Sequence, residues 1–272
     1  MSAPHEAGTI PVRKMNFEFD SVPRDFLNGN LAFSNYFNGL NLLFPEGERF
    51  FMHAVRDGLK TIKNPSPELK EQAKGFYGQE AQHSIEHLKY FEILDKNGYE
   101  FRDELAKFDR FIIKLRKKLP TKLRLAMTAG AEHLTAISSQ MSLTDVDVAN
   151  GHPVMRDLMQ WHAIEEIEHK AVAYDVYAQA SGNYFLRILG YLAAIVVVGG
   201  YSYKFATMFM RQEGYSKRKA AKLIRDDQRQ ILKRHSYLKS QFLAYFKPGF
   251  HPNQIDDEHL IEKARVDLAA YG

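Results

Sequence analysis

The sequence predicts an all-α fold: a four-helix bundle with a long crossover between its two helix pairs, followed by additional C-terminal helices. Long helical segments are separated by breaks rich in Pro, Gly and Asn at 64–67 and 149–153. The layout itself repeats as helix pair, crossover and helix pair. Two of the helices each carry a Glu-x-x-His pair, a spacing that places both side chains on one helix face. Together these features are typical of a bundle that holds metal ions between its helices.

Composition limits the kind of site that the chain can build. Of its 272 residues, 45% are hydrophobic and 26% are charged, which is enough to bury the core of one large domain, alone or with an appendage. The absence of cysteine excludes disulfides, thiolate zinc sites, cysteine-ligated iron–sulfur clusters and cysteine nucleophiles. Any metal must therefore be bound by carboxylates and imidazoles. Residues 1–14 lack the apolar segment of a secretory signal, so we expect a cytoplasmic protein.

The first predicted elements lie in an N-terminal region over 1–43. Residues 1–25 are polar and contain Pro and Gly, which predicts an extended arm, and a short helix is expected over 31–42. The bundle begins at Phe44, with Pro45 in the first helical turn, where a missing N–H costs nothing.

The rest of the bundle completes a domain over 44–180. Ser66 is a good N-cap for the second helix, and the amphipathic crossover is closed by Pro120. The second helix, the crossover, the third helix and the fourth helix are expected over 66–96, 101–119, 121–148 and 153–180.

The two Glu-x-x-His pairs are half of a carboxylate-bridged dimetal site. Glu80 with His83 lies on the second helix, and Glu166 with His169 lies on the fourth. Such a site needs one further glutamate from each of the other two helices. Both pairs have apolar neighbours, and burying charged groups there is costly unless they are paired or coordinated. These neighbours include Phe76, Tyr77, Trp161, Ile164 and Ile167.

Two further glutamates are selected by their distance from the turns. In an antiparallel helix pair, two residues at the same height are equidistant from the loop, so their mean residue number falls within it. The mean is 64 for Glu48 and Glu80 and 149 for Glu132 and Glu166, and both values fall in the predicted breaks. Glu46 gives 63 and stays an alternative to Glu48, although a first-turn carboxylate is also explained by the helix dipole. The predicted metal ligands are Glu48, Glu80, His83, Glu132, Glu166 and His169.

Two more histidines lie on or near the metal-facing stripe. His87 follows His83 by one turn, and His162 precedes Glu166 by one turn. Each is interpreted as an extra ligand, a proton relay or a group that orients a ligand, and the alternative is a hydrogen-bonded histidine of the core or surface. Three neighbouring glutamates are expected on outer helix faces: Glu86, Glu165 and Glu168.

The residues named so far carry two resemblances. The order Glu, Glu-x-x-His, Glu, Glu-x-x-His over 45–180 resembles the ferritin-like di-iron carboxylate superfamily. More specifically, the stretches 44–51, 161–170 and 248–252 resemble a bacterial family of predicted metal-dependent hydrolases, over nearly the whole chain. This second resemblance implies a metalloenzyme more firmly than it implies hydrolysis.

The ligand set predicts the chemistry in part. Four carboxylates and two imidazoles suit two ions of iron, with manganese or zinc as alternatives, and dioxygen could bind at open positions. We therefore expect a di-iron oxidoreductase that oxidises, hydroxylates or desaturates an apolar, lipid-derived substrate, with electrons from an external reductase because the chain has no cysteine cluster and no G-x-G-x-x-G motif. Small residues at 129–131, beside Glu132, leave room for a substrate or for close helix packing. The alternative is a metal-dependent hydrolase with the same dimetal site, and a metal-storage protein is the weaker alternative.

The C-terminal region over 181–272 bears on partners. Residues 188–203 are uncharged, and the segment 184–210 is interpreted as a buried helix, a membrane segment or a monotopic membrane contact. The following segment, 211–239, contains ten Lys or Arg against three acidic residues, which would suit anionic lipid heads at the inner face of the membrane or form a solvated face. Nucleic-acid binding is not expected because no known module accompanies this charge, and a homo-oligomer is compatible with the sequence.

Overall fold

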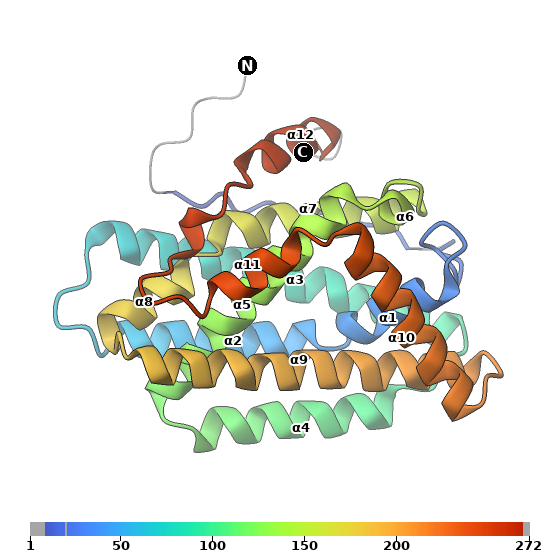
Figure 1. Ribbon diagram of the computed structural model, residues 1–272, viewed down its shortest axis with the longest axis horizontal. Coiled ribbons are helices and arrows are strands. Elements are labelled where there is room, and N and C mark those ends of the chain that lie inside the picture. Colours follow the sequence, from blue (N-terminus) through green and yellow to red (C-terminus); the bar gives the residue numbers. More distant parts are fainter. Residues whose placement is uncertain (1–8, 20, 269–272) are drawn as a thin grey trace.

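The all-α prediction is confirmed. A computed structural model describes residues 9–19 and 21–268, and within these ranges the secondary structure is helical, without strands (Figure 1). Of the predicted N-terminal arm, residues 1–8 and 20 lie outside the described residues. Residues 9–19 have no regular secondary structure.

The N-terminal helices begin at residues suited to a helix start, and Pro45 and Ser66 among them were predicted. Helix α1 (Leu31–Asn41) starts where the side chain of Asn30 accepts a hydrogen bond from the N–H of Phe33. Helix α2 (Phe44–Leu59) has Pro45 in its first turn, and α3 (Pro67–Lys96) starts where Ser66 Oγ accepts from the N–H of Leu69. Each of these side chains satisfies or replaces an N–H that has no partner within the helix.

The second half of the predicted bundle is more divided than the sequence indicates. The crossover is α4 (Arg102–Lys118), and the third helix, α5 (Thr121–Thr144), ends before Asp145, whose extended backbone and side chain cap the short α6 (Val146–Ala149). The fourth predicted helix is interrupted after His169, giving α7 (Pro153–His169) and α8 (Val172–Ala180). At the interruption the ammonium of Lys170 donates to the carbonyl of Ile255 and is paired with Asp257.

The C-terminal elements pack around these helices. Helix α9 (Tyr184–Gln212) runs the length of the molecule with α4 beside it (Figure 1). Phe108 of α4 contacts the rings of Tyr201 and Phe205 of α9. The remaining elements are α10 (Lys217–Arg234), α11 (Leu238–Ala244), a 3-10 turn η1 (Pro252–Gln254) and α12 (Glu258–Leu268).

Four helices enclose the predicted site. Helix α2 packs on α3 and on α5, and α7 packs on α5 and on α3. The residues between them therefore face a common interior, although placement in the ferritin-like superfamily stays a prediction. Helix α9 is long and apolar enough to span a membrane by length and composition, but it also packs on α5 and α1, so it is part of the folded body.

Helices α5 and α9 cross with their backbones in contact. A Cβ added to Gly130 of α5 would lie 2.7 Å from the Cα of Tyr191, and one added to Gly190 of α9 would lie 2.4 Å from the carbonyl carbon of Ala126. These distances are far below van der Waals contact, so only glycine fits on either side. Close helix packing is therefore the role of Gly130, one of the small residues beside Glu132.

We predict that Gly190→Ala lowers the free energy of unfolding by at least about 1–3 kcal/mol, the usual cost of overpacking, because backbone atoms of Ala126 cannot move aside. Urea denaturation would measure this. Gly199→Ala is the matched control, since a Cβ there meets no atom within 4 Å and alanine favours the helix by about 0.5–1 kcal/mol. Equal stability of the two variants would contradict the predicted backbone contact.

Candidate metal centre

The structure brings the six predicted ligands together in the interior. Their residues are at most 4% exposed. They come from four helices: Glu48 from α2, Glu80 and His83 from α3, Glu132 from α5, and Glu166 and His169 from α7.

One group of potential ligand atoms is formed by Glu80, Glu132 and His169, whose donor atoms all lie within 4.8 Å of one another. Nε2 of His169 lies 3.1 Å from Oε2 of Glu132 and 3.3 Å from Oε1 of Glu80. It also lies 3.4 Å from Oε2 of Glu166, one turn away on the same helix. Three carboxylates therefore converge on one imidazole nitrogen.

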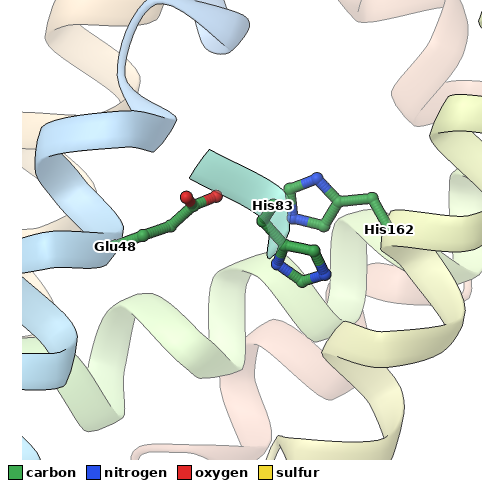
Figure 2. Close-up of side chains that lie close together, drawn as sticks. All are labelled: Glu48, His83 and His162. Carbon is green, nitrogen blue, oxygen red and sulfur yellow. The ribbon is translucent and has the colours of Figure 1, made fainter. Parts of the chain in front are cut away.

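A second group is formed by Glu48, His83 and His162, and a third by Glu80, His83 and Glu166. Figure 2 shows the carboxylate of Glu48, from α2, directed at the imidazoles of His83, from α3, and His162, from α7. The rings of His83 and His162 are stacked, with centroids 4.1 Å apart. Because Glu80 and His83 each belong to two of the three groups, the groups overlap in one continuous centre.

The two additional histidines have different positions. His162 belongs to a ligand group, and its Nε2 is 2.8 Å from Oε1 of Glu166. His87 belongs to none of the groups and instead places Nε2 2.7 Å from Nδ1 of His162. A hydrogen-bonded chain therefore runs from Glu166 through His162 to His87.

The donor atoms fit metal ions because many of them form no hydrogen bond with any described residue. Buried atoms without a hydrogen bond include both carboxylate oxygens of Glu80 and of Glu132, Nδ1 of His83 and Nε2 of His169. Burying such atoms unpaired costs several kcal/mol each, and a cation is the partner that carboxylates and neutral imidazoles share. Glu46 is also buried and is paired with Arg49, but it lies in none of the groups, which favours Glu48 as the ligand from α2.

Comparison with known protein families gives one match. A family model described as "Predicted metal-dependent hydrolase" matches residues 11–256. The chain belongs to this family. No curated protein and no solved structure gives a significant match. The family description names hydrolysis, the alternative in the sequence analysis, and gives no support to oxygen-dependent oxidation as the reaction.

In this member of the predicted metal-dependent hydrolases, burial shifts the pKa values of the side chains in the centre. Burial, together with neighbouring carboxylates, raises the pKa of Glu48 and of Glu80 well above the ordinary value. Burial raises the pKa of Glu132 to about 7, against the effect of His169. For His83, burial lowers the pKa well below the ordinary value.

Glu166 and His169 have the opposite shifts. Burial opposes both charges, but His169 and His162 lower the pKa of Glu166, and Glu132 with Glu166 raises the pKa of His169. These shifts favour the charged forms of Glu166 and His169 and the neutral forms of Glu48, Glu80 and His83. Binding cations there must release protons.

Two polar residues that hold the ligands were not predicted from the sequence. Oε1 of Gln79 lies 2.9 Å from Nδ1 of His169, and Oγ of Ser84 donates to Oε2 of Glu48 at 2.7 Å. Each is adjacent in sequence to a ligand of α3, in a buried stretch of the helix. The signal in the sequence was a polar residue directly beside a predicted ligand.

The placement of Glu86 and Glu165 on outer, solvated faces was wrong. Glu165 is fully buried, with Oε2 3.1 Å from Nε2 of His83 and Oε1 3.1 Å from the guanidinium of Arg13. Burial raises the pKa of Glu165 to about 7, and Arg13 opposes this rise. Glu86 is 1% exposed and accepts from the N–H of Phe17. Both glutamates lie beneath the N-terminal arm, a distant segment whose course the helix periodicity does not reveal.

We predict that Glu80→Ala and His169→Ala each reduce the metal content of the protein to less than about half that of the wild type, because each removes a donor from the centre. Elemental analysis would measure the metal, and circular dichroism would show that the helices remain. Glu46→Gln should keep full occupancy, whereas Glu48→Gln should not. Full occupancy in both alanine variants would reject the ligand assignment.

Proposed function

We propose that the protein is a dinuclear metal-dependent hydrolase whose ions are bound by Glu48, Glu80, His83, Glu132, Glu166 and His169. The observation that carries this proposal is the overlap of three ligand groups at Glu80 and His83 in a buried interior. The family description supports hydrolysis as the reaction class. The ligand atoms without hydrogen bonds support metal binding independently of that description.

Bound metal ions would supply Lewis-acid activation of a substrate and of water. The chain's own residues would manage the protons. Because Nε2 of His162 lies 2.8 Å from Glu166 and Nδ1 lies 2.7 Å from His87, this imidazole can accept a proton at one nitrogen as it releases one at the other. His162 is 7% exposed, more than the six proposed ligands and His87. Of the three residues in this hydrogen-bonded series, His162 is therefore the most accessible to solvent.

An apolar cavity supports an apolar substrate. It has a volume of about 70 Å³ and reaches the centre at Glu48, its charged lining residue. Apolar cavities of this kind hold small apolar groups rather than water. We propose that the apolar end of the substrate enters here while its reacting bond lies near Glu48. The lining comes from α2, α4, α5 and α9 and includes Phe44, Phe51, Phe108, Ala131 and Val198.

Oxygen-dependent oxidation is the second candidate. The same cavity favours it, since an apolar space beside a carboxylate-rich centre also admits dioxygen. In this case the ions would be iron and an external reductase would have to supply electrons, because the sequence contains no cysteine for an iron–sulfur cluster.

We predict metal-dependent hydrolysis of nitrophenyl esters, with longer acyl chains preferred over acetate, in assays of zinc-, manganese- and iron-loaded protein under nitrogen. Ala131→Leu should lower kcat/KM for the long ester at least about tenfold while leaving metal content unchanged, because the larger side chain fills the cavity. Absence of hydrolysis with every metal, together with oxygen consumption by the ferrous protein, would reject the hydrolase in favour of the oxidase.

We further propose that α9 rests on an anionic membrane surface. Four exposed apolar residues follow one another along a single face of this helix: Phe185, Leu189, Leu192 and Val196. Helix α4, which contacts α9, carries exposed basic residues at Lys107, Arg110, Lys114 and Lys117, and α10 is also strongly basic. An apolar stripe beside basic helices is suited to anionic lipid heads. The cavity beside α9 would then open toward the source of an apolar substrate.

Sedimentation with lipid vesicles tests the membrane contact. We expect binding to phosphatidylcholine vesicles that contain phosphatidylglycerol, and reduced binding when this anionic lipid is omitted or salt is raised. Val196→Glu should reduce binding about tenfold or more, whereas Val146→Glu, at another exposed valine on α6, should not. Equal binding of both variants would reject α9 as the membrane contact.

A further inference from the structure

The N-terminal arm is seated on α3 by two glycines. A Cβ added to Gly75 would lie 2.6 Å from Cβ of Ile10 and 2.8 Å from its carbonyl oxygen. One added to Gly78 would lie 2.4 Å from Cγ2 of Val12. The arm therefore occupies a groove that only glycine leaves open, immediately before the first Glu-x-x-His pair. This close fit sets the position of the residue that follows, Arg13.

From this position Arg13 connects two carboxylates of α7. Its guanidinium donates to Glu165 at 3.1 Å and to both oxygens of Glu168, at 2.8 and 2.7 Å. Glu165 is fully buried, and a buried carboxylate needs such a cation. The planar guanidinium binds both at once, which a lysine ammonium cannot reproduce with the same geometry.

Each carboxylate is connected to one of the two predicted histidine ligands, Glu165 directly and Glu168 through Gln79. Oε2 of Glu165 lies 3.1 Å from Nε2 of His83. Oε2 of Glu168 accepts from Nε2 of Gln79 at 2.9 Å, and Oε1 of Gln79 lies 2.9 Å from Nδ1 of His169. Gln79 also donates to the carbonyl of Pro11 at 2.9 Å, so the arm contacts this series a second time.

We propose that Arg13 is a positioning residue that orients both histidine ligands, His83 through Glu165 and His169 through Glu168 and Gln79. Each imidazole has one nitrogen facing the centre and the other facing this network. A partner on the outer nitrogen fixes the tautomer and ring orientation of a metal-ligating histidine, and loss of such partners typically costs about 10- to 100-fold in metal affinity. The inference rests on the proposed metal centre and extends it to the N-terminal arm.

Two variants disturb the network in different ways. Arg13→Gln removes the charge, whereas Gly75→Ala substitutes no residue of the network but displaces the arm at Ile10 and with it Arg13. Gly199→Ala is the matched glycine control, because a Cβ there meets no atom within 4 Å. Arg13→Lys keeps the positive charge but lacks the planar guanidinium that binds both carboxylates at once.

The test is titration of metal-free protein with cobalt(II), whose absorption spectrum reports the ligand geometry, alongside urea denaturation of the metal-free protein. We expect Arg13→Gln and Gly75→Ala to raise the dissociation constants about 10- to 100-fold and to change the bound spectrum, with Arg13→Lys intermediate and Gly199→Ala equal to the wild type. A merely structural role would lower the stability of the metal-free protein and leave the spectrum unchanged.

The outcomes separate this inference from the proposed function. Wild-type affinity and spectrum in Arg13→Gln would overturn the positioning role while leaving the metal centre in place. Failure of the wild-type protein itself to bind cobalt(II) would overturn both.

Discussion

The burial of four carboxylates at one point is the constraint on which the rest of the structure depends. Glu48, Glu80, Glu132 and Glu166 come from four different helices and meet with almost no exposure to water. Burial raises the pKa of Glu80 and of Glu132, while His169 lowers the pKa of Glu166, so these carboxylates are not all stabilised in their charged forms. The packing of α2, α3, α5 and α7 therefore makes sense as the enclosure of a cationic ligand. The hydrophobic residues around these carboxylates keep water out of the enclosure.

The two sides of the centre differ in character. On the Glu48 side lies the apolar cavity between α2, α4, α5 and α9. On the other side the imidazoles of His83 and His169 meet Glu165 and Gln79 beneath the N-terminal arm. One side is thus suited to admitting an apolar molecule, and the other is suited to fixing ligands. This division supports reaction chemistry more than storage, because a storage site needs no shaped apolar entrance.

The positions of the six central residues followed from the sequence because they depend on simple helix geometry. Equal distance from a turn identified Glu48 and Glu132 without knowledge of the tertiary structure, since the paired helices are long. The roles of Glu165 and Arg13 could not be obtained this way. Periodicity places Glu165 away from Glu166 but does not show that a segment some 150 residues earlier covers it. The interruption after His169 likewise coincides with the contacts of Lys170 with Ile255 and Asp257, which are distant in sequence.

The glycine crossing of α5 and α9 links the surface of the protein to its interior mechanically. Gly130 lies two residues before Glu132, and its backbone is held against Tyr191 without an intervening side chain. Helix α9 therefore cannot slide or rotate along α5 without displacing the backbone that carries one of the central carboxylates. The helix with the exposed apolar stripe and the helix that contributes Glu132 are therefore packed with their backbones in direct contact.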